Sequence, residues 1–180
     1  MNAKDTLKIL ILIPFFSYAQ HSENYLKLMG KLKPIDSSKI VTYFKNGKPK
    51  YVGTTTYYEF KNREYEFLTG KHIKYYKKGS RTESLYDSWG TILENKYYDR
   101  NGNLISDAKT LILDTNAKDL QEFEDSNEHI IFVIKTNDYK YSSDLNKWYI
   151  YLESEHRNGK KSGTWKYYFP NGELKKESKK

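Results

Sequence analysis

The sequence predicts an all-β protein, an extended antiparallel meander of repeated β-hairpins with a short helix near its start. Three observations indicate this fold class: Asn-Gly pairs recur between aromatic runs, tyrosine supplies 18 of the 180 residues, and cysteine is absent. Aromatic residues make up 16% of the chain, whereas all hydrophobic residues together make up only 37%. A thin sheet of half-buried tyrosines therefore fits the composition better than a thick aliphatic core.

The first residues have the pattern of a secretory signal peptide. Lys4 and Lys8 precede an apolar run over residues 9–16, and a small-residue cleavage site follows. Spanning a bilayer takes about 20 apolar residues, and this run is roughly half that length, which favours a leader over a membrane anchor. We therefore expect residues 1–19 to be removed by cleavage after Ala19. The mature protein is then periplasmic or secreted, and it is not transmembrane.

The helix and the hairpin repeat follow the leader, in a repeat domain that we place at residues 20–174. A short helix is expected over residues 22–29, because Ser22 can cap its start and Gly30 can end it. The repeat itself is clearest at residues 163–174, which read Gly-Thr-Trp-Lys-Tyr-Tyr-Phe-Pro-Asn-Gly-Glu-Leu. Residues 97–104 match its second half, and weaker copies occupy residues 43–47 and 70–79.

In each copy an aromatic residue stands four positions before a glycine that we assign to a turn. These turn glycines are Gly47, Gly79, Gly102 and Gly172. Asn-Gly favours the tight type I′ turn because both residues tolerate positive φ, so we expect two-residue turns at the Asn-Gly pairs, Asn158-Gly159 included. Lys78-Gly79 should form a looser turn. In the best copy, alternation places Trp165, Tyr167 and Phe169 on one face of a strand, which we expect to be buried.

The spacing of the turn glycines predicts the remaining elements. It indicates an insertion within residues 57–66 and two diverged repeats in residues 107–156. Within the second region, strands are expected at 129–136 and 148–153, with turns near 137–138 and 142–146. Residues 116–124 form either a short helix or an acidic surface loop. The lysine-rich tail at 175–180 is expected to fray.

The copies at 97–104 and 163–174 resemble the MORN-like repeat of bacterial proteins of the YwqK-type antitoxin family. In that repeat, Gly-x-Trp is followed by paired aromatic residues and then by Asn-Gly-x-Leu. The resemblance implies an extended meander of hairpins with a binding or scaffolding role, and it implies no reaction. An antitoxin that neutralises a cytosolic toxin would not normally carry a secretory leader, so the exported chain departs from the family name.

Common catalytic and metal-binding motifs are absent from the sequence. It contains no cysteine nucleophile, no Gly-x-Ser-x-Gly, no phosphate-binding Gly-Lys-Ser/Thr and no His-Glu-x-x-His. The four histidines are widely separated, and His72 occupies the place of Trp165 in the repeat, which indicates a structural role. We therefore expect a protein that is not an enzyme and has no catalytic residues, metal site or cofactor. The enzymatic alternative, a hydrolase, would need a deep pocket with a coupled histidine and carboxylate.

Lysines beside aromatic residues make the last hairpin the candidate binding surface. Its members are Lys160, Lys161, Trp165, Lys166 and Tyr168. Exposed rings there could stack on sugars or meet a partner's sheet edge. The alternative interpretation is that Trp165 belongs to the core and that the lysines protect an edge strand from aggregation.

The net charge of +8 favours an acidic partner, and export disfavours nucleic acid. The sequence therefore predicts a protein-interaction scaffold that binds another protein. One alternative is a cell-envelope binder of acidic glycan or lipid, and the other is an antitoxin-like or immunity-like protein.

Overall fold

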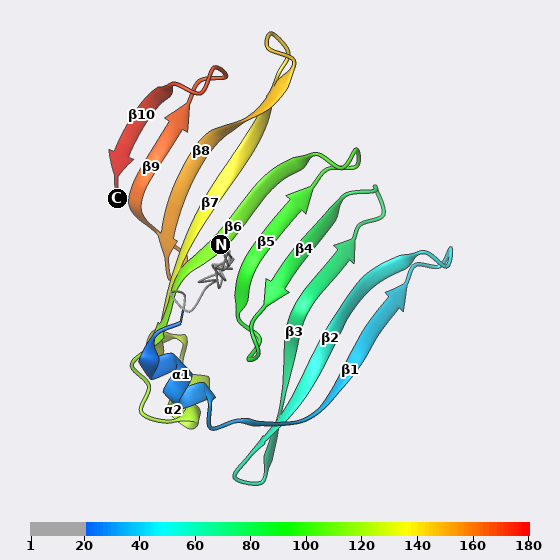
Figure 1. Cartoon of the computed structure of the whole chain (residues 1–180), viewed down its shortest axis with the longest axis vertical. Helices are drawn as coiled ribbons and strands as arrows, with labels where there is room; N and C mark the ends of the chain where they lie inside the picture. The colour runs from blue at the N-terminus through cyan, green and yellow to red at the C-terminus, as the bar shows by residue number, and fades with distance from the viewer. Residues whose placement is uncertain (1–20) are drawn as a thin grey trace, which may run out of the picture.

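Ten strands form one antiparallel sheet in the computed structural model, which describes residues 21–180. The strands lie side by side in chain order from β1 to β10, so each one pairs with its neighbours in the sequence (Figure 1). This arrangement confirms the predicted all-β meander of hairpins. The signal peptide predicted at residues 1–19 lies outside the described residues.

Within the described residues, the elements are ten strands, two short α-helices and one 3-10 helix. In chain order they are α1 (Glu23–Met29), β1 (Lys33–Tyr43), β2 (Pro49–Phe60), β3 (Arg63–Tyr75), β4 (Arg81–Tyr86), β5 (Ile92–Tyr98), β6 (Leu104–Thr115), α2 (Leu120–Asp125), the 3-10 helix η1 (Asn127–His129), β7 (Ile130–Ser142), β8 (Lys147–Arg157), β9 (Lys160–Tyr168) and β10 (Leu174–Lys179). The insertion predicted within residues 57–66 corresponds to the tip of the long β2–β3 hairpin.

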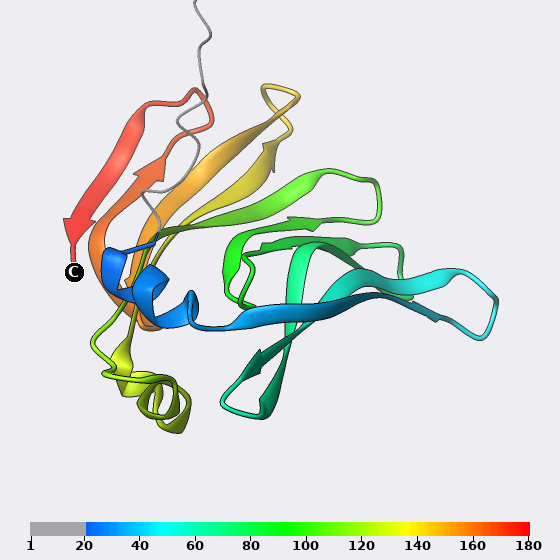
Figure 2. The same ribbon diagram turned by 60° about the horizontal axis from the view of Figure 1, so that its bottom comes forward.

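The sheet has two different ends. The connections at 44–48, 76–80, 99–103, 143–146 and 169–173 lie at one end, which we call the turn end (Figure 1). Both helices lie at the opposite end, which we call the helical end, and in the second view the strands curve and twist away from it (Figure 2). The helical end therefore has helices beside the sheet, whereas the turn end consists of short connections between strands (Figure 1).

The short helix α1 forms where the sequence predicts it. The Ser22 hydroxyl accepts a hydrogen bond from Tyr25 N–H at 3.1 Å, and Gly30 ends the helix. The backbone N–H of Ser22 also donates to Leu113 O at 2.8 Å, and His21 forms an isolated bridge with Leu113. The start of the described chain is thus fixed to β6.

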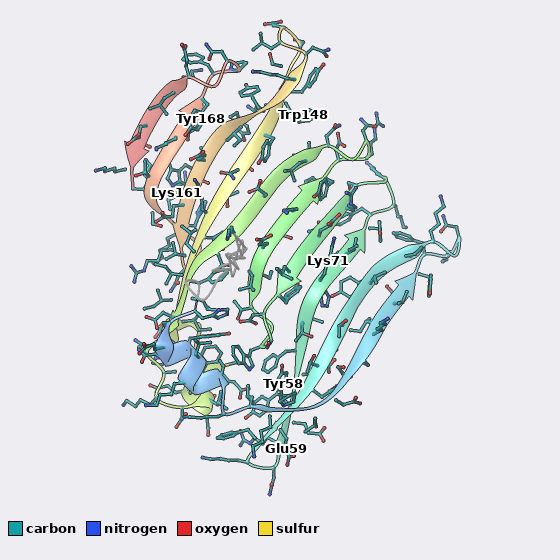
Figure 3. The ribbon with its side chains drawn as sticks, in the orientation of Figure 1. Tyr58, Glu59, Lys71, Trp148, Lys161 and Tyr168 are labelled. Atoms are coloured by element: carbon teal, nitrogen blue, oxygen red, sulfur yellow. The ribbon has the colours of Figure 1, made fainter. Side chains whose placement is uncertain are left out.

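The largest hydrophobic cluster lies at the helical end. Its buried members are Tyr25, Leu28, Met29, Leu32, Tyr58, Leu113 and Leu120. Figure 3 shows Tyr58 on β2 at the same end of the sheet as the helices. Toward the turn end no second layer within residues 21–180 covers the sheet, so side-chain pairs on its faces replace a core there (Figures 1 and 2).

Four turns at the turn end share a three-residue geometry that finishes in a glycine. In the first, Phe44 N–H donates to Lys48 O at 2.8 Å, Gly47 N–H donates to Phe44 O at 3.0 Å, and Gly47 has φ 78°. The same bonds and a positive φ recur at Gly79, Gly102 and Gly172. This is the hairpin turn in which a left-handed residue follows a tight turn.

The two-residue type I′ turn predicted at these positions is wrong. Only the glycine has positive φ, and the preceding Asn46, Asn101 and Asn171 do not. Two of these asparagines act through their side chains: Asn46 Oδ1 accepts the N–H of residue 48 at 3.2 Å, and Asn171 Oδ1 accepts that of residue 173 at 3.1 Å. Because the residue before the glycine keeps negative φ, Lys78 fits as well as asparagine. The turn at Gly79 is therefore not looser.

Turns with two consecutive positive-φ residues occur at the helical end. Asn158-Gly159 has φ values of 49° and 75°, as the sequence predicts, and Lys61-Asn62 forms a second such turn that was not predicted. A further turn, from Asp87 to Thr91, contains Gly90 at φ 84° and was also missed.

Residues 107–156 and the tail differ from their predictions. No turn occurs at 137–138, because β7 runs on to Ser142 with only a register shift after Asp138. The turn predicted at 142–146 is present, and residues 116–124 include the start of α2, whose first N–H groups are capped by Asp119. The tail does not fray, because residues 174–179 form β10 and pair with β9.

Trp165 fills a bulge in the sheet near the end of the chain. Its indole Nε1–H donates to Glu155 O at 3.1 Å and to Ser162 O at 3.2 Å, and only 7% of the residue is exposed. Gly163 enters this bulge at φ 60°. Phe169, predicted on the same buried face, is 43% exposed because it lies in the turn.

His72 occupies the equivalent place in the β2–β3 pair, as the repeat predicts. Its Nε2 lies 3.0 Å from Thr54 O and 3.0 Å from Thr69 O, and the residue is 2% exposed. Gly70 matches Gly163 with φ 70°. The imidazole lies against Gly53 on β2, where an added Cβ would come within 2.1 Å of His72 Nδ1. His72 is thus a packing residue of the repeat.

Replacing Gly53 by alanine should therefore force the imidazole out of its bulge. We expect Gly53→Ala to lower the free energy of unfolding by about 1–3 kcal/mol, the usual cost of overpacking. The measurement is urea denaturation of the single variant and of the Gly53→Ala/His72→Ala double variant. The alanine should cost much less in the His72→Ala background, and an equal cost in both backgrounds would contradict the proposed contact.

The turn glycines should differ from Gly53, because their requirement is conformational. A Cβ on Gly102, at φ 85°, would meet no atom within 4 Å. We expect Gly102→Ala to cost about 1–2 kcal/mol in the same assay, and Gly102→Asn to cost less, since asparagine tolerates the left-handed region. A neutral alanine variant would show that the turn does not need positive φ.

Candidate binding surface

The residues predicted as a binding surface are spread along both faces and the full length of β9. Lys161 lies toward the helical end of the strand and Tyr168 toward the turn end (Figure 3). The Lys161 Nζ lies 4.8 Å from the centroid of the Trp165 ring. Because Trp165 is buried and its N–H is already used by the backbone, it acts as a packing residue here. The structure does not gather these residues into one exposed patch.

Lys166 and Tyr168 lie on the opposite face of β9 from Trp165, next to Glu153. Lys166 pairs directly with Glu153 on β8 and with Glu177 on β10. Burial raises the pKa of Tyr168, and the adjacent Glu153 carboxylate raises it further. Tyr168 therefore has a partner within the sheet, and Lys166 lies opposite a glutamate on each neighbouring strand, which reduces the availability of both side chains to a ligand.

The pairing around Lys166 is one part of a polar row that crosses most of the sheet. In register, the row contains Glu83, Lys96, Asp107, Asn137, Glu153, Lys166 and Glu177. Opposite charges face each other at several steps, and such cross-strand pairs stabilise a sheet by roughly 0.2–1 kcal/mol each. We call this set the polar row. The sequence reasoning missed it because the row becomes visible only when the strand register is known.

Side chains beside the polar row satisfy its charges. Lys71 Nζ and Arg81 Nε each lie 2.8 Å from a carboxylate oxygen of Glu83. Both hydrogen bonds lower the pKa of the Glu83 carboxyl, and the bond from Lys71 has the larger effect. On the other half of the sheet, Tyr139 O–H donates to Asp107 Oδ2 at 2.6 Å. Burial, and then this hydrogen bond, raise the pKa of Tyr139 to about 12.

A hollow of about 870 Å³ opens between the first two turns of the turn end. Its lining residues are Tyr43, Phe44, Lys45, Asn46, Lys48, Pro49, Lys50, Tyr75, Tyr76, Lys77 and Gly79. We call it the turn cleft. Among the described residues, it is lined by four lysines and four aromatic residues, and by no carboxylate. Lysines and aromatic rings thus converge between the β1–β2 and β3–β4 turns, and not at the last hairpin as predicted.

The turn cleft exists because β2 separates from β3 before the strand ends. Pairing between the two strands begins at Tyr51 and Lys74, so Pro49 and Lys50 have no partner on β3. Proline lacks the N–H that a central strand would have to donate. Figure 1 shows the β1–β2 turn diverging from the β3–β4 turn. Pro49 is the sequence signal that could have located this opening.

The two outer strands of the sheet offer different edges. In β1, ten of eleven residues are exposed, and residues 36–42 pair with β2 without interruption. In β10 the regular pairing covers only residues 176–179, and three of its six residues are lysines. Short, lysine-rich edges resist the addition of another strand. β1 is therefore the more accessible edge.

A buried cluster around Asp87 joins α1 to the β4–β5 turn. Asp87 Oδ2 lies 3.0 Å from His21 Nε2 and accepts from Tyr25 O–H at 3.1 Å, while Oδ1 accepts the N–H groups of Trp89 and Thr91 at 2.8 Å. Burial raises the pKa of Tyr25, and the Asp87 charge raises it further. The histidine and carboxylate are packed beneath α1, and neither lines the turn cleft.

Two further properties concern the same part of the chain. Within residues 21–180, no three or more His, Cys, Asp or Glu side chains are arranged to hold a metal ion. None of the helices in this region has the length and apolar character needed to cross a membrane.

No family model matches the chain, and no curated protein or solved structure is similar to it. Its class is therefore defined by the fold: a single-layer antiparallel sheet of repeated hairpins, with a core at one end, a basic aromatic cleft at the other and one accessible edge.

Removal of the Asp87 carboxylate should loosen the contact between α1 and the sheet. We expect Asp87→Ala to lower the free energy of unfolding by about 2–4 kcal/mol, because it leaves several buried donors without an acceptor. Asp99→Ala is the matched control, since Asp99 accepts the equivalent turn N–H groups but is only half-buried and forms no hydrogen bond or ion pair with α1 in the described chain, whereas Asp87 is buried. Denaturant unfolding of both variants tests this, and equal losses would contradict a role for the α1 contact.

Proposed function

We propose that this chain is a non-catalytic interaction scaffold of the MORN-like repeat kind, exported by its leader, which binds a partner protein along the β1 edge. The observation that carries the proposal is the exposed, regularly paired run of residues 36–42 in the outermost strand. An extended peptide can add a strand to such an edge through main-chain hydrogen bonds.

The chemistry of β1 supports strand addition over this run in particular. Proline at position 34 and the register shift between Pro34 and Asp36 limit the accessible edge at its start. Beyond them, Val41 is 42% exposed and can contact side chains of an added strand. The run also holds one acidic and one basic residue, Asp36 and Lys39, which can fix the register of the partner.

The single-layer sheet favours a binding role over catalysis. Enzyme sites require groups held in a concave, water-excluding pocket. Two histidine and carboxylate pairs occur in the described part of the chain: His21 and Asp87 are enclosed between α1 and a turn, and His129 and Glu122 lie in the segment of α2 and η1. Neither pair lines the turn cleft. The long sheet presents an extended surface, which is the usual property of repeat scaffolds.

Two adjacent serines in β1 provide a sharp test. Successive residues of an antiparallel strand alternately face the paired neighbour and the open side, so of Ser37 and Ser38 only one N–H faces β2. We expect proline at one position to destabilise the protein by more than about 1 kcal/mol, through loss of a β2 hydrogen bond. Proline at the other removes no bond to β2, and at Ser37 it would remove only the exposed hydrogen bond from the Ser37 N–H to Asp36 Oδ1. It should therefore change the thermal unfolding temperature little and block an added strand.

The assay is capture of binding partners from an envelope extract of the producing cells by residues 20–180. The wild type should retain one stoichiometric protein at high salt, that protein should protect β1 amides from hydrogen exchange, and the stable proline variant should lose it. A stable variant that keeps the partner, or protection of β10 in place of β1, would refute docking on the β1 edge. Recovery of glycan or lipid alone would point to the alternative envelope-binding role.

A further inference from the structure

We infer that the turn cleft is a separate binding site for an anionic oligosaccharide of the uronic acid type. The site lies between two turns and does not use the outer edge of β1. The inference is therefore independent of the proposed strand addition, and either one can fail without the other.

The charge of the turn cleft indicates a ligand with carboxylates. Lys45, Lys48, Lys50 and Lys77 line it, and no aspartate or glutamate does. Within the described part of the chain none of these four lysines forms an ion pair, whereas Lys71 and Lys135 elsewhere on the sheet pair with glutamates. The cleft thus concentrates positive charge that the protein itself leaves uncompensated, and this favours an anionic ligand.

The rings of the turn cleft distinguish a saccharide from a simple anion. Tyr43 is 61% exposed and Tyr76 is 39% exposed, while Phe44 and Tyr75 are half-buried. Exposed aromatic faces are suited to flat apolar surfaces, and a pyranose ring presents such a surface in its axial C–H groups. Phosphate or an acidic side chain has no comparable face. A uronic acid ring combines the apolar face with a carboxylate and hydroxyls.

The size and polar groups of the turn cleft fit the same ligand. Its volume of about 870 Å³ falls in the range of roughly 300–1,000 Å³ that ligand sites occupy. Asn46 also lines the cleft, and because its Oδ1 accepts the N–H of Lys48, its Nδ2 is the group that can donate to a sugar hydroxyl. The exposed rings come from different hairpins, with Tyr43 at the end of β1 and Tyr76 in the turn after β3, so a short oligosaccharide would bridge the β1–β2 and β3–β4 turns.

The test is isothermal titration calorimetry of residues 20–180 with a short oligogalacturonate, with a neutral oligosaccharide of equal length and with a polyglutamate peptide of equal charge as comparisons. We expect saturable binding of the oligogalacturonate, at least about tenfold tighter than either comparison. Binding should weaken as salt rises, because exposed charges are screened.

Matched variants locate the binding. Lys48→Gln/Lys50→Gln should weaken oligogalacturonate binding at least about tenfold, whereas Lys175→Gln/Lys176→Gln, which removes the same charge from β10, should change it less than about twofold. Tyr43→Ser should weaken binding several-fold even at high salt, and Tyr141→Ser, at another exposed tyrosine of the turn end, should not. All six substituted residues are exposed, and thermal unfolding checks that each of the four variants remains folded.

Each contrary result overturns the inference. No binding at about 10 mM oligogalacturonate would exclude the site. Equal losses in the two lysine pairs would show nonspecific attraction to a basic protein. Polyglutamate binding as tightly as the oligosaccharide, with the same sensitivity to Lys48 and Lys50, would assign the cleft to acidic peptides instead.

Discussion

The sheet depends on side-chain pairing across its strands, because no second layer formed by residues 21–180 covers it toward the turn end (Figures 1 and 2). The polar row supplies much of this pairing, with Glu83, Asp107 and Glu153 each held by neighbours on adjoining strands. Single exposed ion pairs contribute little, but a row of facing polar residues favours one register for the strands from β4 to β10. The register in turn fixes the turns and bulges, and so determines which side chains reach the turn cleft and the β1 edge.

The hairpin meander was predictable from local sequence because its signals lie within a few residues of one another. Aromatic residues at fixed distances from Gly47, Gly102 and Gly172 identify strand and turn directly. The turn type was not predictable from Asn-Gly alone, since asparagine serves either as a positive-φ residue or as a side-chain cap. Likewise, the lysines of β10 suggested fraying, yet backbone pairing with β9 orders them in an exposed strand.

The binding surface was harder to predict, because it depends on segments that are distant in the sequence. Reasoning from the best repeat copy directed attention to Trp165 and its lysines, but good agreement with a repeat marks packing positions, which Trp165 and His72 both occupy. The turn cleft lies between two weaker copies. It opens because Pro49 interrupts pairing with β3, and its rings and lysines come from both hairpins.

Placement of the core at the helical end also sets a gradient of rigidity along β2, β3, β6 and β7, the strands that contribute to it. Backbone hydrogen bonds near α1 break only when the hydrophobic cluster opens. Those near the glycine turns are accessible to water, so breaking them costs less free energy. The β1–β2 and β3–β4 turns diverge at the turn end, where the hydrogen bonds break at lower free energy. The walls of the cleft can therefore adjust their separation to what enters between them, while the scaffold beneath α1 stays fixed.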